Sequence, residues 1–339
     1  MWEYLESPAR SPSADEQLAP DPEVVWRADV GRGTVGEPAM GERVTVVTSA
    51  DRFVYAIDTR TGGLFWRHHS DASFGVGPVI GEEAVFAATE GVDGKVEALA
   101  LRDGKRIWQI AVGDVGAPLV LRDSILYVAT QDGAALAVTT RGKVLWHRRV
   151  GSTRSGPLVT RTLVAIATLG DSLIVLERSS GLRQSHSALP VTTAAPLALA
   201  NDSTAVLASP SGALLGLALP SGLVRWRIDT SEPIPGVPVI ARDTLFALGG
   251  SCTLWIVPLA RPTAVDSTAI PGCGTSAGPA VLRDGVLVAT VRGEITFFDR
   301  TTRKRLWTRA LGSELRHPPV VHNRQIVAAP IIGRLVSFR

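Results

Sequence analysis

The stretch "AIDTRTGGLFW", residues 56–66, decides the fold of this chain. Alternating apolar residues lead into a turn at Thr61-Gly62-Gly63, and a strand that carries Trp66 follows. Gly62 can take the positive φ that a tight turn requires, and Trp66 offers a large flat surface for packing between neighbouring elements. If this hairpin occurs once, it is a local feature. If it recurs, it indicates the architecture of the whole chain.

The glycine–tryptophan spacing of this hairpin recurs along the chain. Glycine precedes tryptophan by four residues at three further places, and Trp307 has Arg303 in the glycine position. Two copies are degenerate, with Ser185 and Asp266 in place of tryptophan. The series steps by 38 to 42 residues through Trp26, Trp66, Trp108, Trp146, Ser185, Trp226, Asp266 and Trp307.

A proline marker has the same period. Eight times a proline precedes a short apolar segment, at steps of 39 to 42 residues: Pro38, Pro78, Pro118, Pro157, Pro196, Pro238, Pro279 and Pro319. Each repeat then contains four short strands separated by turns rich in Gly, Asp and Ser. Four strands in a repeat of about 40 residues are typical of one blade of a β-propeller.

The two series together predict an all-β fold, an eight-bladed β-propeller of four-stranded antiparallel blades. After Pro319 the chain supplies only three strands, and the missing fourth is the N-terminal strand around Trp26. We therefore expect residues 22–30 to close the ring by pairing with the C-terminal three strands, which leaves no open edge. The predicted domains are an extended N-terminal arm, residues 1–21, and a single propeller, residues 22–339.

The pattern Ala56-x-Asp58-x-x-Thr61-Gly62-x-x-x-Trp66 resembles the tryptophan-docking motif of the pyrroloquinoline-quinone-type propeller family. The resemblance extends from about residue 22 to residue 339. It implies that six tryptophans dock neighbouring blades: Trp26, Trp66, Trp108, Trp146, Trp226 and Trp307. The family contains large quinoprotein dehydrogenases and smaller eight-bladed scaffold proteins of the BamB type. At about 40 residues per blade, this chain resembles the smaller group.

The resemblance favours a non-enzymatic scaffold for protein–protein interaction. Quinoprotein enzymes need calcium ligands, a catalytic aspartate and typically two adjacent cysteines, whereas Cys252 and Cys273 lie 21 residues apart. We therefore expect no catalytic residues, metal or cofactor, and an extrinsic accessory subunit that stabilises a larger membrane-associated protein complex. The alternatives are a BamB-like outer-membrane β-barrel assembly factor and a quinoprotein-type dehydrogenase.

Two short patterns match enzyme signatures without the context that those signatures require, and the histidines match none. "GRGTVG", residues 31–36, leads into a strand, whereas a dinucleotide site needs a helix there. "GTSAG", residues 274–278, leads into Pro279 and a strand, whereas a nucleophile elbow also opens a helix. The six histidines show no metal-binding spacing. The sequence therefore predicts none of these three sites.

The charge and hydropathy of the chain limit its partners. The net charge is +3, and no dense Lys/Arg cluster occurs, so we expect no nucleic acid partner and only weak attraction to an anionic membrane. No run of 18 apolar residues occurs, which predicts no transmembrane segment. The first residues do not resemble a signal peptide. The expectation is a periplasmic protein peripheral to a membrane, with the cytoplasm as the alternative compartment.

The two cysteines bear on that choice of compartment. Cys252 and Cys273 fall in loops that should emerge at the same end of blade six. A disulfide between them would close a loop of about 20 residues and contribute roughly 3 kcal/mol. The alternative is two unrelated thiols, but blade six has lost its Gly and its Trp, and a replacement link favours the disulfide. Such a bond would indicate the periplasm.

The N-terminal arm is the last unusual segment. It is rich in Pro, Ser and acidic residues, yet it contains Trp2, Tyr4 and Leu5. A polar segment with aromatic anchors suits an arm that binds a partner subunit. The alternative is an arm that lies on its own propeller.

Overall fold

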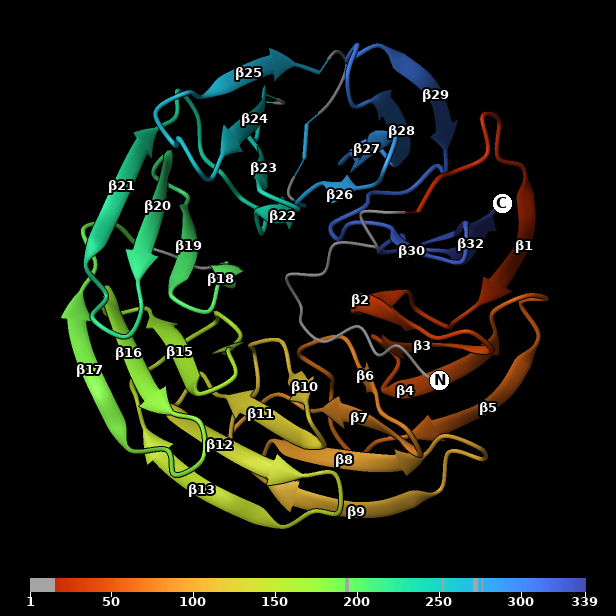
Figure 1. Ribbon diagram of the computed structural model, residues 1–339. Helices are drawn as coiled ribbons and strands as arrows, with labels where there is room; N and C mark the ends of the chain where they lie inside the picture. Colours follow the sequence, from red (N-terminus) through yellow and green to blue (C-terminus); the bar gives the residue numbers. More distant parts are fainter. Residues whose placement is uncertain (1–15, 193–194, 252, 271–273, 276) are drawn as a thin grey trace.

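The computed structural model describes residues 16–192, 195–251, 253–270, 274–275 and 277–339. In this part of the chain, eight four-stranded antiparallel sheets stand around a central axis like the blades of a propeller (Figure 1). The predicted fold class is confirmed. Among these residues, no helix has both the length and the apolar character needed to cross a membrane.

Seven blades consist of four strands that follow one another in the chain, from the axis to the rim. Blades one to four are β2 (Thr34–Met40), β3 (Val44–Ser49), β4 (Phe53–Asp58), β5 (Leu64–His69); β6 (Val79–Ile80), β7 (Ala84–Ala88), β8 (Lys95–Ala100), β9 (Arg106–Ala111); β10 (Val120–Arg122), β11 (Ile125–Ala129), β12 (Ala134–Thr139), β13 (Val144–Arg149); and β14 (Leu158–Val159), β15 (Leu163–Thr168), β16 (Ser172–Glu177), β17 (Arg183–Ala188). Blades five to seven are β18 (Ala198–Asn201), β19 (Thr204–Ser209), β20 (Ala213–Ala218), β21 (Val224–Asp229); β22 (Val239–Ala241), β23 (Thr244–Leu248), β24 (Thr253–Pro258), β25 (Asp266–Ala269); and β26 (Ala280–Val281), β27 (Gly285–Ala289), β28 (Glu294–Asp299), β29 (Arg305–Ala310).

Blade eight joins the two ends of the chain. It contains β30 (Val320–His322), β31 (Gln325–Ala328), β32 (Arg334–Phe338) and, as its outermost strand, β1 (Val24–Asp29). Strand β1 runs antiparallel to β32, with Trp26 opposite Ser337, and Glu23 and Arg339 exchange two backbone hydrogen bonds of 3.0 Å. The predicted closure of the ring by the N-terminal strand is therefore confirmed.

The core lies between blades rather than inside any one of them. The two middle strands of a blade are flanked on both faces by neighbouring blades, so nearly every side chain along them is buried, as in β3 and β7. One apolar cluster, for example, joins Phe86 of blade two to Leu126 and Leu136 of blade three. Because each blade buries its surface only against neighbours, stability depends on a complete ring.

The disc has two ends. We call one end the turn face: it carries the turns that join the first strand of a blade to the second and the third strand to the fourth. We call the other end the link face: it carries the turns that join the second strand to the third and the links between blades. Consecutive strands run in opposite directions, so this division holds for all eight blades.

Residues 16–22, which we call the N-terminal strap, cross the turn face over blades seven and eight. Near the axis, the carbonyl oxygen of Glu16 accepts the backbone N–H of Arg283, and its carboxylate accepts that of Arg324, both at 3.0 Å. Leu18 is buried in the apolar cluster that these two blades share. At the rim, the guanidinium of Arg309 pairs with Asp21 and donates to the Pro22 carbonyl.

Candidate functional site

Four of the six tryptophans fasten one blade to the next in the same way. The indole N–H of Trp26 donates to the carbonyl oxygen of Thr59 at 2.8 Å. The indoles of Trp66, Trp108 and Trp146 make the equivalent bond, each at 2.9 Å, to the following blade. The acceptor always lies in the turn between the third and fourth strands, so each indole spans one seam of the turn face.

The turn that receives each indole is shaped by its own sequence. In blade one, burial alone would raise the pKa of Asp58, but the backbone N–H groups of Arg60 and Thr61 donate to its carboxylate and hold the pKa below its usual value. Gly62 has φ +75°, and a Cβ there would lie 2.8 Å from the ring of Trp26. Only glycine fits under the ring at this position.

The other two tryptophans make no such bond within the described part of the chain. The indole nitrogen of Trp307 is buried without a hydrogen-bond partner, and the ring packs beside Phe297 at 5.5 Å between centroids. Trp226 lies over Gly216 of its own blade, where a Cβ would come within 2.2 Å of the indole nitrogen. The six positions share packing of the ring rather than the hydrogen bond, and the ring is only partly buried at Trp108 and Trp226.

The two degenerate copies retain a polar link across their seams. The Ser185 hydroxyl donates to the carbonyl oxygen of Pro220 in blade five. Asp266 pairs with Arg303 in blade seven, and this hydrogen bond holds the pKa of the Asp266 carboxyl below its usual value. Both replacements lack the apolar area of an indole, so these two seams bury less apolar surface at the rim.

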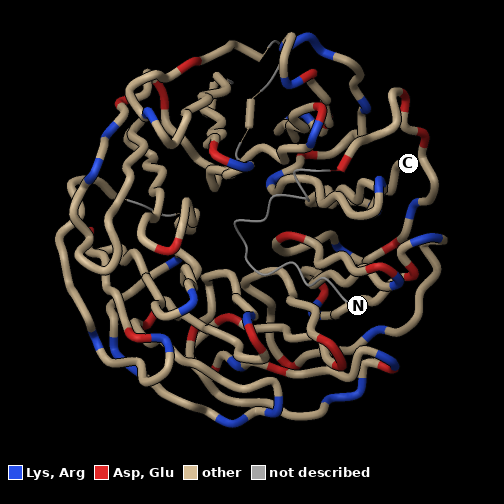
Figure 2. Tube along the Cα trace, viewed as in Figure 1, with Lys and Arg blue, Asp and Glu red and all other residues tan. Residues whose placement is uncertain are grey.

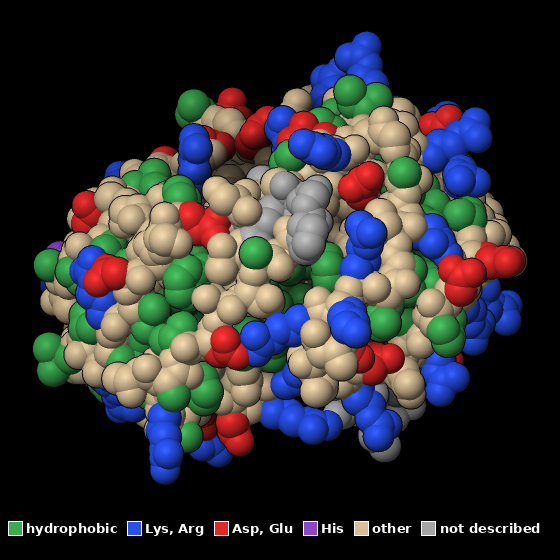
Figure 3. All heavy atoms as spheres, turned by 90° about the horizontal axis from the view of Figure 1, so that it is seen from above, with side chains coloured by type: hydrophobic (Ala, Val, Ile, Leu, Met, Phe, Trp, Pro, Cys, Tyr) green, Lys and Arg blue, Asp and Glu red, His purple; other side chains and the backbone are tan. Residues whose placement is uncertain are grey.

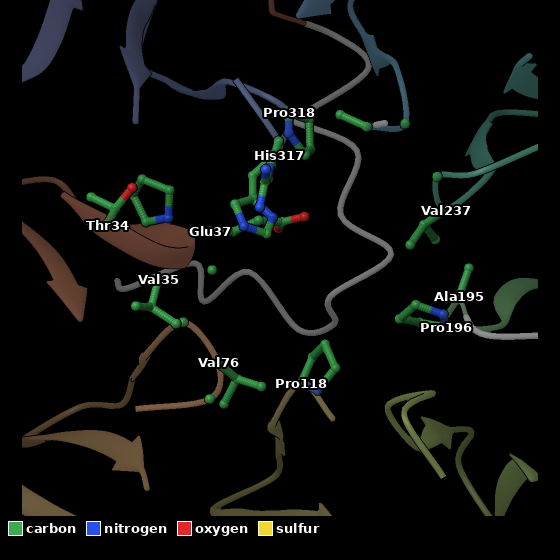
Figure 4. A pocket seen from close by; sticks show the side chains of 18 of the residues that line it. Thr34, Val35, Glu37, Val76, Pro118, Ala195, Pro196, Val237, His317 and Pro318 are labelled. Carbon is green, nitrogen blue, oxygen red and sulfur yellow. The ribbon is translucent and has the colours of Figure 1, made fainter. Parts of the chain in front are cut away.

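The central channel holds a cavity with a volume of about 550 Å³ (Figure 4). The residues just before the first strand of each blade line it, and most of them are Gly, Ala, Pro or Val. A Cβ on Gly36 would lie 2.1 Å from the backbone nitrogen of Gly77, and one on Gly77 would lie 2.2 Å from the carbonyl oxygen of Glu37. The innermost strands approach too closely for larger residues.

Four channel-lining residues have ionisable side chains: Glu37, Arg154, Arg316 and His317. Burial, with a smaller contribution from the neighbouring Arg316, lowers the pKa of His317 to about 4. The imidazole is therefore neutral at physiological pH. No group of three or more His, Cys, Asp or Glu side chains that could hold a metal ion occurs among the described residues. The donors that line this channel do not match the calcium ligands that the quinoprotein alternative requires.

Four large apolar side chains are exposed in turns of the link face. Val92, Leu169, Val291 and Ile332 lie in four of its turns, and their exposed fractions range from 41% to 94%. Single exposed apolar side chains are common on folded proteins, so these four mark a partner surface only if one partner contacts them together. Sequence reasoning missed this set because each residue is isolated in the sequence, and only the ring brings the four turns to one face.

Ionic contacts between blades were also missed. Arg178 of blade four donates to the Tyr127 hydroxyl at 2.7 Å and to Asp123 at 2.6 Å, both in blade three. Glu97 of blade two is 2% exposed and lies 3.7 Å from His68 of blade one. These residues hold particular seams together, and no repeated pattern marks them. Cys252, Cys273, Trp2, Tyr4 and Leu5 lie outside the described residues.

Comparison with known proteins extends over nearly the whole chain. A family model described as "Outer membrane protein assembly factor BamB" matches residues 17–111, 92–265 and 252–338. Among curated proteins of that name, the one from Burkholderia pseudomallei is 28% identical over 172 residues, which cover 49% of this chain and 44% of the relative. The one from Shewanella oneidensis is 25% identical over 262 residues, which cover 71% and 65%. The chain thus spans less than half the length of the first of these relatives.

Solved structures show the same fold at low identity. BamB from Moraxella catarrhalis superposes with a TM-score of 0.74 and 15% identity, covering 93% of this chain and 98% of that one. A quinohemoprotein alcohol dehydrogenase from Comamonas testosteroni superposes with a TM-score of 0.76 and 12% identity, covering 97% and 79%. BamB and an alcohol dehydrogenase thus share this propeller, and function has to be argued from the site.

Proposed function

The chain belongs to the family of the outer membrane protein assembly factor BamB, and from this premise we propose that it is a non-enzymatic scaffold subunit of the complex that assembles outer-membrane β-barrel proteins. In this role it is periplasmic, peripheral to the membrane, and held by other protein subunits. The observation that carries the proposal is the family match along almost the entire propeller, from residue 17 to residue 338.

The chemistry of the channel supports a scaffold rather than a dehydrogenase. Its lining of Gly, Pro, Ala and Val offers close backbone packing and few side chains that could bind or activate a substrate. The quinoprotein alternative therefore has only the shared fold in its favour, and likeness at 12% identity supports no more than the fold.

We propose that the link face is the principal surface for the partner subunit. Four large apolar side chains are exposed in its turns, and apolar anchors supply much of the binding energy of protein interfaces. Trp2, Tyr4 and Leu5 of the N-terminal arm are proposed as a second attachment. The described part of the strap begins at Glu16, near the axis of the turn face.

Site-specific photocrosslinking in native membranes tests the link face. A photoreactive residue replaces Ile332 on the link face, and a matched one replaces Leu223 at the rim, since both side chains are 69% exposed. We expect the probe at position 332 to crosslink a subunit of the β-barrel assembly complex, and the probe at position 223 to give no crosslink to that subunit. Equal crosslinking from both positions would contradict the proposed surface.

Purification from native membranes tests the function itself. We expect the full chain to be recovered with subunits of the β-barrel assembly complex. A chain that is recovered alone, and that oxidises alcohols or sugars once supplied with quinone and calcium, would contradict the scaffold role and favour the dehydrogenase.

A further inference from the structure

The charged residues of the turns are segregated between the two ends of the disc. The turns of the turn face carry fifteen Lys and Arg against eight Asp and Glu. The turns and links of the link face carry five Lys and Arg against nine Asp and Glu. The strap adds Glu16 and Asp21, and Glu23 follows it, but an excess of cations remains on the turn face. The small net charge of the chain therefore conceals a disc with one basic end and one acidic end.

Several cations of the turn face extend into solvent. Arg141 and Lys143 are exposed, and no ion pair involves either of them within the described ranges. Arg102 and Lys105 share the single carboxylate of Asp103, at 3.6 and 3.5 Å. Exposed pairs of this kind are weak and leave the local potential positive. Figure 2 shows Lys and Arg also predominating along the outermost strands.

Exposed apolar side chains encircle the same end. Of fifteen large hydrophobic residues that are exposed in the described ranges, nine lie in or directly after a turn between the third and fourth strands, at the edge of the turn face. Val24 and Val25 lie at the same edge, at the start of β1. Examples are Leu64, Phe65, Ile107, Leu145, Leu223 and Leu306, with exposed fractions from 43% to 69%. Figure 3 looks onto the rim and shows hydrophobic side chains exposed there, with Lys and Arg at both the upper and the lower edge.

We propose that the turn face is a docking surface for an anionic phospholipid bilayer. A bilayer surface is broad and flat, as the end of the disc is, and it offers both phosphate charges and an apolar layer just beneath them. Lys and Arg near an anionic surface are attracted to it, and apolar side chains at the edge can enter the interface. The acidic link face is repelled, so the disc lies with one end toward the lipid and the channel mouth toward the aqueous phase.

A bilayer fits this surface better than an acidic protein or a nucleic acid does. Neither of these explains a circle of apolar side chains that follows the rim through most of the blades, because a compact partner covers only one sector of a disc. The inference goes beyond the proposed function and does not depend on it. It would hold for this propeller in any complex, and it leaves the link face free for protein.

Vesicle sedimentation tests the proposal. The full chain is mixed with vesicles of phosphatidylcholine alone or with 30% phosphatidylglycerol, at low and at physiological salt. We expect binding to the anionic vesicles, at least a ten-fold weaker association with neutral vesicles, and a decrease as salt rises. No difference between the two lipids would overturn the proposal.

A matched pair of charge variants locates the surface. One variant removes four exposed cations of the turn face, Arg60→Gln, Arg102→Gln, Arg141→Gln and Lys143→Gln. Its control removes four exposed cations at the link face, Arg32→Gln, Arg52→Gln, Arg292→Gln and Arg334→Gln. We expect the first to lose about ten-fold in vesicle binding and the control to lose less than two-fold. Equal losses would show that only net charge matters and would overturn the proposal, provided that both variants unfold at the wild-type temperature.

A second pair separates lipid from an acidic protein. Phe65→Ser removes an apolar side chain at the edge of the turn face, and Ile332→Ser is its control on the link face. We expect only Phe65→Ser to weaken vesicle binding, by several-fold, with the difference growing at physiological salt. If the wild-type chain bound immobilised poly-glutamate but not the anionic vesicles, the turn face would belong to an acidic protein, and the membrane assignment would be overturned.

Discussion

Trp66 of blade one donates its indole N–H to the carbonyl oxygen of Leu101 in blade two, at 2.9 Å. The residue is 8% exposed, so burial and the hydrogen bond both contribute to the seam. We expect Trp66→Phe to lose mainly the hydrogen bond, about 1 kcal/mol, and Trp66→Ala to lose roughly 3 to 5 kcal/mol because it opens a cavity. Urea denaturation measures both. Equal losses would mean that the ring contributes little packing at this seam.

Gly104 is the position on which the Trp66 ring rests. It has φ +70°, and a Cβ there would lie 2.4 Å from the ring. Gly312 has a similar φ of +76°, but nothing lies within 4 Å of its would-be Cβ. We expect Gly104→Ala to destabilise the fold by at least about 2 kcal/mol more than Gly312→Ala, because only the former adds a clash to the backbone strain. Thermal unfolding of the two variants tests this difference, and similar melting temperatures would contradict it.

The architecture could be predicted from the sequence because its signals are local and periodic. Gly62 and Trp66 are four residues apart, and their hairpin depends on turn residues close in the sequence. Similar turn residues recur in most of the repeats. Closure of the ring could also be predicted by counting strands, because the last repeat has only three and the N-terminal strand around Trp26 is the fourth. The identity of the blades therefore needed no knowledge of long-range contacts.

The rest of the candidate site depends on contacts that no local pattern encodes. Asp266 meets Arg303 from 37 residues away, and Glu16 meets Arg324 from 308 residues away. The charges of the two ends were present in the sequence, but the net value of +3 averages them. Only the alternation of strand directions assigns each turn to an end of the disc, which is why the basic face could not be seen in the composition.

The strap makes a prediction about the seam between blades seven and eight. Leu18 is 6% exposed and packs among the apolar residues that these blades share. We expect Leu18→Ala to cost about 2 kcal/mol in chemical denaturation, near the low end for a buried leucine because the strap lies at the surface. Leu223→Ala is the control, since that side chain is 69% exposed and its loss should cost less than about 0.5 kcal/mol. A Leu18→Ala variant as stable as the control would mean that the strap does not contribute to the ring.

The proposed link between Cys252 and Cys273 predicts the thiol content of the native protein. We expect protein isolated from its own compartment without reductant to react with less than one equivalent of a thiol reagent, and with two after reduction. Reduction should lower the free energy of unfolding by roughly 3 kcal/mol, given a loop of about 20 residues. Two free thiols before reduction would show that the disulfide is absent. One argument for a periplasmic location would then be lost.

His317 predicts that the fold becomes less stable in acid. Its pKa is about 4 in the folded protein, well below the usual value of 6.5, because burial in the channel wall and the nearby Arg316 disfavour the imidazolium. Between about pH 4 and pH 6.5, the His317 imidazole is therefore protonated in the unfolded chain and neutral in the folded chain. Its contribution to stability is fully present above about pH 6.5, is lost progressively as the pH falls toward 4, and changes no further below that.

We expect the loss of stability from His317 to be about 2 kcal/mol, which is less than the full pKa shift would give because the ring is only partly buried. Urea denaturation of wild type and His317→Asn between pH 4 and pH 7 measures it. The slope over that interval should be smaller in the variant than in the wild type, because carboxylates such as Asp58 and Asp266 still contribute near pH 4. An unchanged slope in the variant would assign the acid sensitivity to other groups.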